Sequence, residues 1–348
     1  MASSQTLYRI ADGEIRRCID AYLSLARHSK GLTAILPQHL ADERVRVIVM
    51  AGFGIAVRQA TAEEVFSEWR RRQAITFDLE TGVTAGVYSN LRTVAETFYQ
   101  QLSAATIGFT HFDPDYIAGN PFLLPLLQHL GGVFSKSKLK ELVGSVSDNS
   151  ISKPAAERLA KLLSERVDPA YIVKGEILKR LESTLEGIVR DLVGRVLLES
   201  IVDAALRQRG LPFLREKQYE SLAGVVYDFR ADFVLPDATS PRVFIEVRKS
   251  SSRHASLYAK DKMFSAINWK GKTADLLAVL VVDGEWTRET LHVLANVFDY
   301  VVPMGRIDEL MESIEAYLNG DRTKLKWLIE FQITPAYGYP LKPGRFAG

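Results

Sequence analysis

The chain has 348 residues, of which 47% are hydrophobic and 25% are charged, and its formal net charge is +2 at pH 7. This composition is typical of soluble globular proteins and excludes a disordered chain, while the length favours two domains, or one large domain with a helical extension. A net charge this small does not identify a polyanionic partner, so any interaction with nucleic acid has to depend on local concentrations of charge.

The sequence gives no sign of a disulfide, a structural zinc site, a membrane span or a signal region. Cys18 is the only cysteine, and the six histidines form no HxxxH or HxH pair, so the sequence predicts neither a disulfide nor a structural zinc site. The apolar run over residues 47–57 is interrupted by Gly52 and Gly54 and is too short to cross a bilayer, and the first residues contain no apolar signal region. We therefore expect a cytoplasmic protein that does not interact with membranes.

The first 150 residues have the pattern of a helical domain. Apolar residues recur at spacings of three and four over residues 15–26, 62–75 and 94–102. The segment 144–152 is rich in Gly, Ser, Asp and Asn, and a helix is expected after it, with Ser152 as N-cap and Pro154 in the first turn. These signals predict a helical N-terminal domain over residues 1–150 and a second domain over residues 151–348.

The second domain has the pattern of a mixed α/β fold. A long amphipathic helix from about residue 179 ends at Gly210, a favourable residue after a helix C-terminus. Strands are expected over residues 227–235, 243–249, 276–282 and 300–303, the first two as an antiparallel hairpin, with helices over 254–268, from about Thr287, and over 306–318. The fold class is therefore α/β (α+β), with a mixed central sheet flanked by helices and a helical N-terminal domain.

Two acidic residues of the predicted hairpin are the main candidates for chemistry. In the strand 243–249, Glu246 and Arg248 share one face with Phe244, and Lys249 lies on the other, so we expect Glu246 and Arg248 to face outward together. Asp232 lies on the less apolar face of the preceding strand, and pairing of the two strands brings it near Glu246. Two close carboxylates repel each other unless a cation such as Mg²⁺ binds between them; the alternative is a salt-bridged sheet face with no catalytic role.

The spacing of these residues, D-x(13)-E-x-[RK], resembles the PD-(D/E)XK nuclease superfamily, and type II restriction endonucleases in particular. The resemblance covers residues 180–305, and includes the stretch SSSRHASLYAKDKMFSAINWKGK after the second strand. It implies a restriction-endonuclease-like core, with Asp232 and Glu246 as ligands of one or two Mg²⁺ ions. It also implies that Glu199, on the helix before the hairpin, is a catalytic residue facing the metal site.

This chain departs from the superfamily at one catalytic position. The superfamily has E-x-K where this sequence has Glu246-Val247-Arg248, and an arginine stays protonated and cannot act as a general base. Four possibilities follow: Arg248 stabilises charge on the phosphate, Lys249 takes the lysine's place at a bulge, Lys260 or Lys262 reaches in from the next helix, or Arg248 is an inactivating change.

The segment that follows the strand is basic. Residues 246–272 contain seven basic and two acidic side chains, a local net charge of +5. Such a patch favours contacts to DNA phosphates, although a solvated helix face would have the same composition. The candidate DNA-binding residues are Ser251, Arg253, His254, Lys260 and Lys262.

These features together predict a function, with two alternatives. The resemblance implies a Mg²⁺-dependent, sequence-specific endonuclease of double-stranded DNA that acts as a homodimer or higher oligomer, because a two-fold dimer cuts both strands of a palindromic site. One alternative is a catalytically impaired DNA-binding module of the same fold. The other is a repair or recombination nuclease that recognises DNA structure rather than sequence.

Overall fold

The chain divides into two compact units in the computed structural model, which describes residues 5–250, 255–331 and 333. Unit 1 comprises residues 1–25 and 33–197, and unit 2 comprises residues 26–32 and 198–348. The boundary predicted near residue 150 lies inside unit 1, because the turn-rich segment there forms a small antiparallel hairpin of β1 (Val146–Ser147) and β2 (Ser150–Ile151) that packs against neighbouring helices of the same unit.

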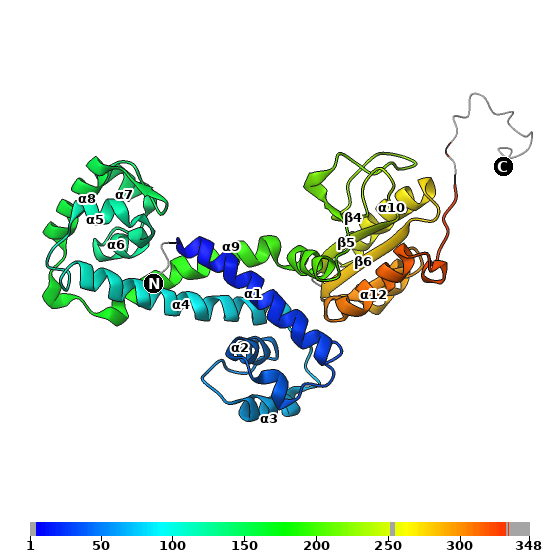
Figure 1. The fold of residues 1–348 in the computed structure, drawn as a ribbon, viewed down its shortest axis with the longest axis horizontal. Coiled ribbons are helices and arrows are strands. Elements are labelled where there is room, and N and C mark those ends of the chain that lie inside the picture. The colour runs from blue at the N-terminus through cyan, green and yellow to red at the C-terminus, as the bar shows by residue number, and fades with distance from the viewer. Residues whose placement is uncertain (1–4, 251–254, 332, 334–348) are drawn as a thin grey trace, which may run out of the picture. The chain divides into compact units, whose positions relative to one another are not determined.

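Unit 1 is helical, as the spacing of its apolar residues predicts (Figure 1). α2 and α4 pack closely because Gly82 lacks a side chain: a Cβ there would lie 2.9 Å from the carbonyl oxygen of Ile48. No helix in the described part of the chain is long and apolar enough to span a membrane. The helices are α1 (Leu7–His28), whose last residues belong to unit 2, α2 (Glu43–Gly52), α3 (Ala62–Arg72), α4 (Leu79–Ala105), α5 (Pro114–Gly119), α6 (Leu124–Leu130), α7 (Lys136–Val143), α8 (Lys153–Arg166) and most of α9 (Lys174–Gln208).

Unit 2 contains a five-stranded mixed sheet within its described residues, so the predicted α+β class is confirmed. The strand order is β3-β4-β5-β6-β7; β3, β4 and β5 pair antiparallel, and β5, β6 and β7 pair parallel. The strands are β3 (Leu214–Arg215), β4 (Phe233–Leu235), β5 (Val243–Ser250), β6 (Leu277–Gly284) and β7 (Tyr300–Pro303). α10 (Ala255–Lys272) connects β5 to β6, α11 (Arg288–Leu294) connects β6 to β7, and α12 (Ile307–Leu318) follows β7.

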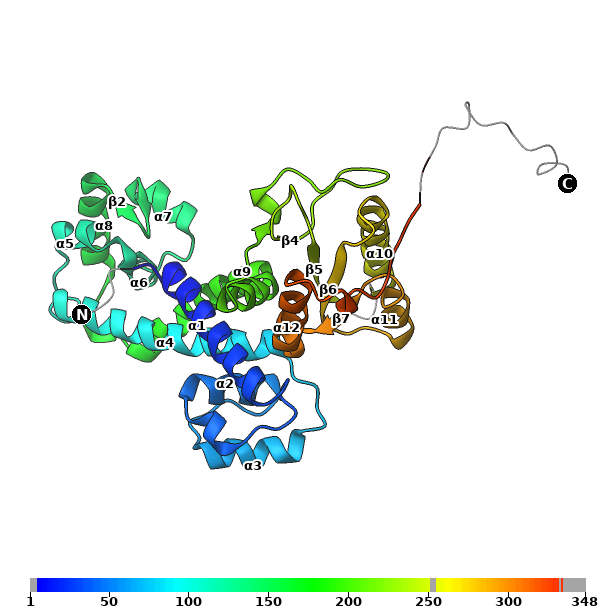
Figure 2. The same ribbon diagram turned by 45° about the vertical axis from the view of Figure 1, so that its right-hand side comes forward.

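Helices cover both faces of this sheet. α10 and α11 lie on one side of the strands and α12 on the other (Figure 2). On the α10 side, the ring of Phe244 packs edge-on against Trp269 at a centroid distance of 4.9 Å. Residues 243–247 of β5 are therefore all buried, as is usual for the central strands of a sheet with parallel pairing.

The strand predicted over residues 227–235 is mostly a loop. β4 includes only Phe233–Leu235, and Phe229 forms an isolated bridge with Leu222 instead of pairing with β5. Backbone groups of Val226 and Tyr227 bond to the side chain of Asn268 on α10. The alternating pattern was misleading here because these backbone groups find partners other than a neighbouring strand.

Candidate active site

Asp232 and Glu246 lie opposite each other across the β4–β5 pair. Phe233 pairs with Ile245 in the antiparallel register, so the next opposed pair is Asp232 and Glu246. The backbone N–H of Val247 donates to Asp232 Oδ2 at 2.7 Å, which fixes the orientation of that carboxylate. The structure thus brings together the two acidic residues proposed from the sequence.

Glu246 does not face solvent, and the expectation that it looks outward is wrong. Its side chain is only 1% exposed. Glu246 shares a face of β5 with Phe244, and α10 covers that face. The carboxylate therefore lies under a helix, where a charge is costly unless cations or hydrogen-bond donors surround it.

Lys262 supplies one of these cations. Its Nζ lies 2.6 Å from Glu246 Oε2, and its side chain is 4% exposed. Lys260, two residues earlier on α10, is exposed. The sequence allowed either Lys260 or Lys262 to reach the carboxylates, and the structure places Lys262 there. Lys262 was also predicted to contact DNA at the surface, and its burial corrects that prediction.

Arg248 lies beside both carboxylates. Its Nη1 is 4.0 Å from Asp232 Oδ2, and its Nη2 is 3.9 Å from Glu246 Oε2. About a third of the side chain is exposed. β5 and β6 pair in unbroken register as far as Ser250, so there is no bulge at Lys249, which is exposed and points to the opposite face from Arg248. The regular strand thus argues against Lys249 in the lysine's place.

The electrostatics of Glu246 reflect this crowded environment. Burial, followed by repulsion from Asp232, raises the pKa of Glu246 to about 8, although Lys262 and Arg248 act to lower it. Glu246 Oε1 is buried and has no hydrogen-bond partner among the described residues. Lys262 and Arg248, the cations described beside it, thus do not fully offset the burial of this carboxylate, and its Oε1 could accept a further ligand.

Tyr219 holds the backbone next to Asp232, a role that sequence reasoning missed. Its hydroxyl accepts a hydrogen bond from the N–H of Ala231 at 2.6 Å and donates one to the carbonyl of Ala231 at 2.7 Å. Burial raises the pKa of this hydroxyl, so it stays protonated and can donate. No local pattern marks Tyr219, because its role depends on a contact across twelve residues of loop.

Glu199, on α9, is held at the β3 edge of the sheet. Its carboxylate accepts a hydrogen bond from Arg215 Nη2 at 2.6 Å. Arg215 is the strand partner of Phe233, and its guanidinium lies over the Phe233 ring at 5.7 Å. Successive residues of a strand point to opposite faces, so Arg215 and Phe233 lie on the face of the sheet away from Asp232 and Glu246. Glu199 forms no metal-ligating group with these two carboxylates among the described residues, and its participation in catalysis stays a prediction.

Some of the basic side chains counted over residues 246–272 are buried, so the surface carries fewer of them than the sequence suggests. Lys262 is paired with Glu246, and Lys270 is fully buried with its Nζ 2.6 Å from Asp299 Oδ2, so neither is free to contact a polyanion. Lys260 is exposed and remains a candidate for DNA contact. The other candidates, Ser251, Arg253 and His254, lie outside the described residues.

The two carboxylates suit a hard divalent cation. Mg²⁺ commonly binds through one or two carboxylates and completes its coordination with water and substrate phosphate oxygens, and the unpartnered Oε1 of Glu246 fits such a ligand. The described residues include no group of three or more His, Cys, Asp or Glu side chains that could hold a metal. Any ion here would therefore depend on Asp232, Glu246, water and substrate.

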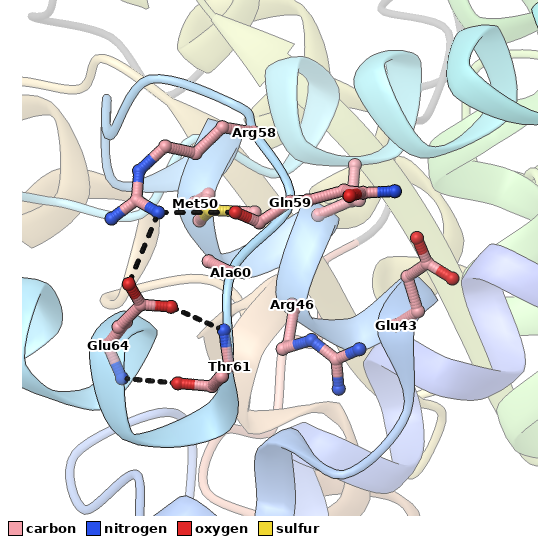
Figure 3. Close-up of a pocket in the computed structure, with 9 residues that line it drawn as sticks. Glu43, Arg46, Met50, Arg58, Gln59, Ala60, Thr61 and Glu64 are labelled. Atoms are coloured by element: carbon pink, nitrogen blue, oxygen red, sulfur yellow. Dashed lines mark hydrogen bonds and ion pairs between the residues drawn. The ribbon is translucent and has the colours of Figure 1, made fainter.

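A pocket in unit 1 offers less chemistry than the two carboxylates. It is a pocket of about 400 Å³, formed by α2, the segment 58–61 and the start of α3 (Figure 3). Its two arginines are engaged: Arg46 donates to the carbonyls of Leu40 and Ala41, and Arg58 pairs with Glu64 at 3.5 Å. Glu43 balances the remaining charge, so the pocket has no concentrated charge and no buried reactive group.

Comparison with protein-family models, with curated proteins and with solved structures found no match. The functional interpretation therefore depends on the residues and geometry of this chain.

Proposed function

We propose that this protein is a Mg²⁺-dependent endonuclease that hydrolyses phosphodiester bonds of double-stranded DNA at specific sequences, in the manner of a type II restriction enzyme. The observation that carries the proposal is the opposed pair of Asp232 and Glu246, with Arg248 and Lys262 beside it. Paired carboxylates next to two cations suit a reaction whose substrate and transition state are anionic.

Asp232 and Glu246 would hold the Mg²⁺ ion, and a bound ion would supply polarisation of the phosphate and a lower pKa for an attacking water. Arg248 is part-exposed and would offer its guanidinium to a phosphate oxygen, since a permanently charged fork stabilises developing negative charge. Lys262 is buried against Glu246 and would do what the lysine of the superfamily's E-x-K does, orienting the water and stabilising charge.

A homodimer accompanies this proposal. One copy of the chain contributes one pair of opposed carboxylates, and cutting both strands of a palindromic duplex at once needs two sites related by a two-fold axis. Size-exclusion chromatography with light scattering measures this state directly.

Incubation of the purified protein with unmethylated phage DNA and Mg²⁺ tests the proposal. We expect discrete fragments, and we expect EDTA or Glu246→Ala to abolish them. Glu141→Ala, which removes an exposed carboxylate paired only with an exposed lysine in unit 1, should cut normally. A smear would mean cleavage without sequence specificity, and intact DNA with the wild-type protein would contradict the proposal.

A further inference from the structure

An exposed cluster of aromatic rings lies on the same unit as the carboxylates. Tyr227 stacks on Phe264 of α10 with a centroid distance of 5.8 Å and an interplanar angle of 21°, and Phe229 packs edge-on against Tyr227 at 5.8 Å. Phe229 and Phe264 are each 49% exposed and Tyr227 is 36% exposed. We call these three residues the aromatic face; exposed apolar side chains that contact one another mark an interaction site more often than single exposed ones do.

The aromatic face is held rigidly. The Oδ1 of Asn268, which is 1% exposed, accepts hydrogen bonds from the N–H groups of Val226 and Tyr227, and its Nδ2 donates to the carbonyl of Tyr227 at 2.9 Å. Gly224 allows this approach, because a Cβ there would lie 2.1 Å from Asn268 Nδ2. These three bonds fix the backbone that carries Tyr227, the central ring of the aromatic face, before any ligand binds.

The aromatic face is also close to the candidate active site. Phe229 precedes Asp232 by three residues, so their Cα atoms are at most about 10 Å apart. A distance of about 10 Å corresponds to one or two nucleotides along a DNA strand. A strand with its phosphate at Asp232 and Glu246 would therefore have its next one or two nucleotides at the distance of the Phe229 backbone.

Positive charge accompanies these rings. Lys260 is exposed and precedes Phe264 by one helical turn, so the two side chains are neighbours on the surface of α10. Arg230 is exposed and follows Phe229 directly, but it lies 4.0 Å from Glu216, and the exposed Asp228 stands between Tyr227 and Phe229, so Lys260 is the basic side chain beside the rings that the inference uses. Aromatic rings interleaved with basic side chains are the pattern by which proteins bind unpaired nucleic acid, whereas three rings are far fewer than the roughly 20–30 residues on each side of a stable protein interface.

We infer that the aromatic face stacks nucleobases that become unpaired next to the cleaved phosphate, so that the duplex is bound in a form opened at or near the cut. This inference rests on the proposed nuclease function and specifies the form of its substrate. Stacking tolerates any base, so the aromatic face would sense the opening of the duplex rather than its sequence.

Binding to two fluorescein-labelled DNA probes, measured by anisotropy with Ca²⁺ in place of Mg²⁺, tests this inference. One probe is a fully paired duplex and the other is a fork of the same length with unpaired arms. We expect the wild-type protein to bind the fork about tenfold more tightly. Phe229→Leu and Phe264→Leu should each lose most of that preference while binding the paired duplex within about twofold of wild type.

Phe134→Leu is the matched control, because Phe134 is an exposed phenylalanine of unit 1, and it should keep the preference. Equal binding of fork and duplex by the wild-type protein, or a preference that survives both leucine substitutions, would overturn the inference. So would loss of self-association in the leucine variants, since the aromatic face would then be a contact between copies. Failure of the nuclease proposal is separate: it appears as absence of Mg²⁺-dependent cleavage of any DNA by the wild-type protein.

Discussion

Replacing Lys262 by methionine is expected to lower the single-turnover rate of DNA cleavage by about 10²–10³-fold, the usual cost of removing one group that stabilises transition-state charge. Lys262 Nζ lies 2.6 Å from Glu246 Oε2, whereas Lys260 on the same helix is exposed. Lys260→Met should therefore weaken DNA binding by a few-fold and leave the rate at saturating DNA within about twofold. Quenched-flow or gel assays at saturating DNA separate the two effects.

The same substitution should change the pH dependence of stability. The folded-state pKa of Glu246, raised to about 8 from an ordinary value of 4.5, means that folding favours the protonated acid, so the free energy of unfolding falls as the pH rises between these values. Lys262 opposes the rise in the pKa of Glu246. Removing Lys262 therefore raises this pKa further, and the free energy of unfolding continues to fall to higher pH. We expect Lys262→Met to cost about 3–5 kcal/mol at about pH 9 and less at about pH 6 in urea titrations of metal-free protein.

Two results would contradict this role for Lys262. Equal rates for Lys262→Met and the wild-type protein would leave Arg248, of the two cations described at the carboxylates, as the one with a catalytic effect. A loss of stability independent of pH would mean that Lys262 stabilises the fold by packing alone and not by its charge beside Glu246.

Asp299→Ala is expected to destabilise unit 2 by about 3–5 kcal/mol, because it leaves a buried lysine without its counter-ion. Asp299 precedes β7, and its Oδ2 accepts bonds from Lys270 Nζ at 2.6 Å and from the N–H of Ala278 at 2.7 Å. Its Oδ1 accepts bonds from the N–H groups of Lys326 and Trp327. This one carboxylate therefore ties the end of α10, the start of β6 and the segment after α12 together.

Urea unfolding followed by tryptophan fluorescence measures this effect, since three of the four tryptophans, Trp269, Trp286 and Trp327, belong to unit 2. Asp275→Ala is the control: Asp275 is half-exposed and pairs with the exposed Arg322, so its loss should cost less than about 1 kcal/mol. Similar costs for the two substitutions would show that the four bonds to Asp299 have little net value.

Local sequence patterns predicted most of unit 2. The strands of the parallel half were predicted to within about two residues, because continuous apolar runs flanked by helices have few other solutions. The segment 227–235 was mispredicted, since its alternation of apolar and polar residues matches a strand while its backbone bonds to Asn268, some forty residues later. The backbone of this segment bonds to the side chain of Asn268 instead of to a neighbouring strand, and the spacing of apolar residues does not reveal such a contact.

The candidate site was predicted in part. Spacing and pairing indicated that Asp232 and Glu246 would be neighbours, because an antiparallel hairpin fixes which residues oppose each other. The burial of Glu246 and the choice of Lys262 over Lys260 depend on how α10 lies across the sheet and on its rotation about its own axis. Neither quantity is local, so neither follows from sequence spacing.

Binding of Mn²⁺, followed by the electron paramagnetic resonance signal of the free ion, tests most directly whether the two carboxylates form a metal site. Mn²⁺ accepts the same oxygen ligands as Mg²⁺. We predict saturable binding to the wild-type protein, at least tenfold weaker in Asp232→Asn and unchanged in Asp275→Asn. Equal affinity of the wild-type protein and Asp232→Asn, or no saturable binding at all, would contradict the assignment of Asp232 and Glu246 as metal ligands.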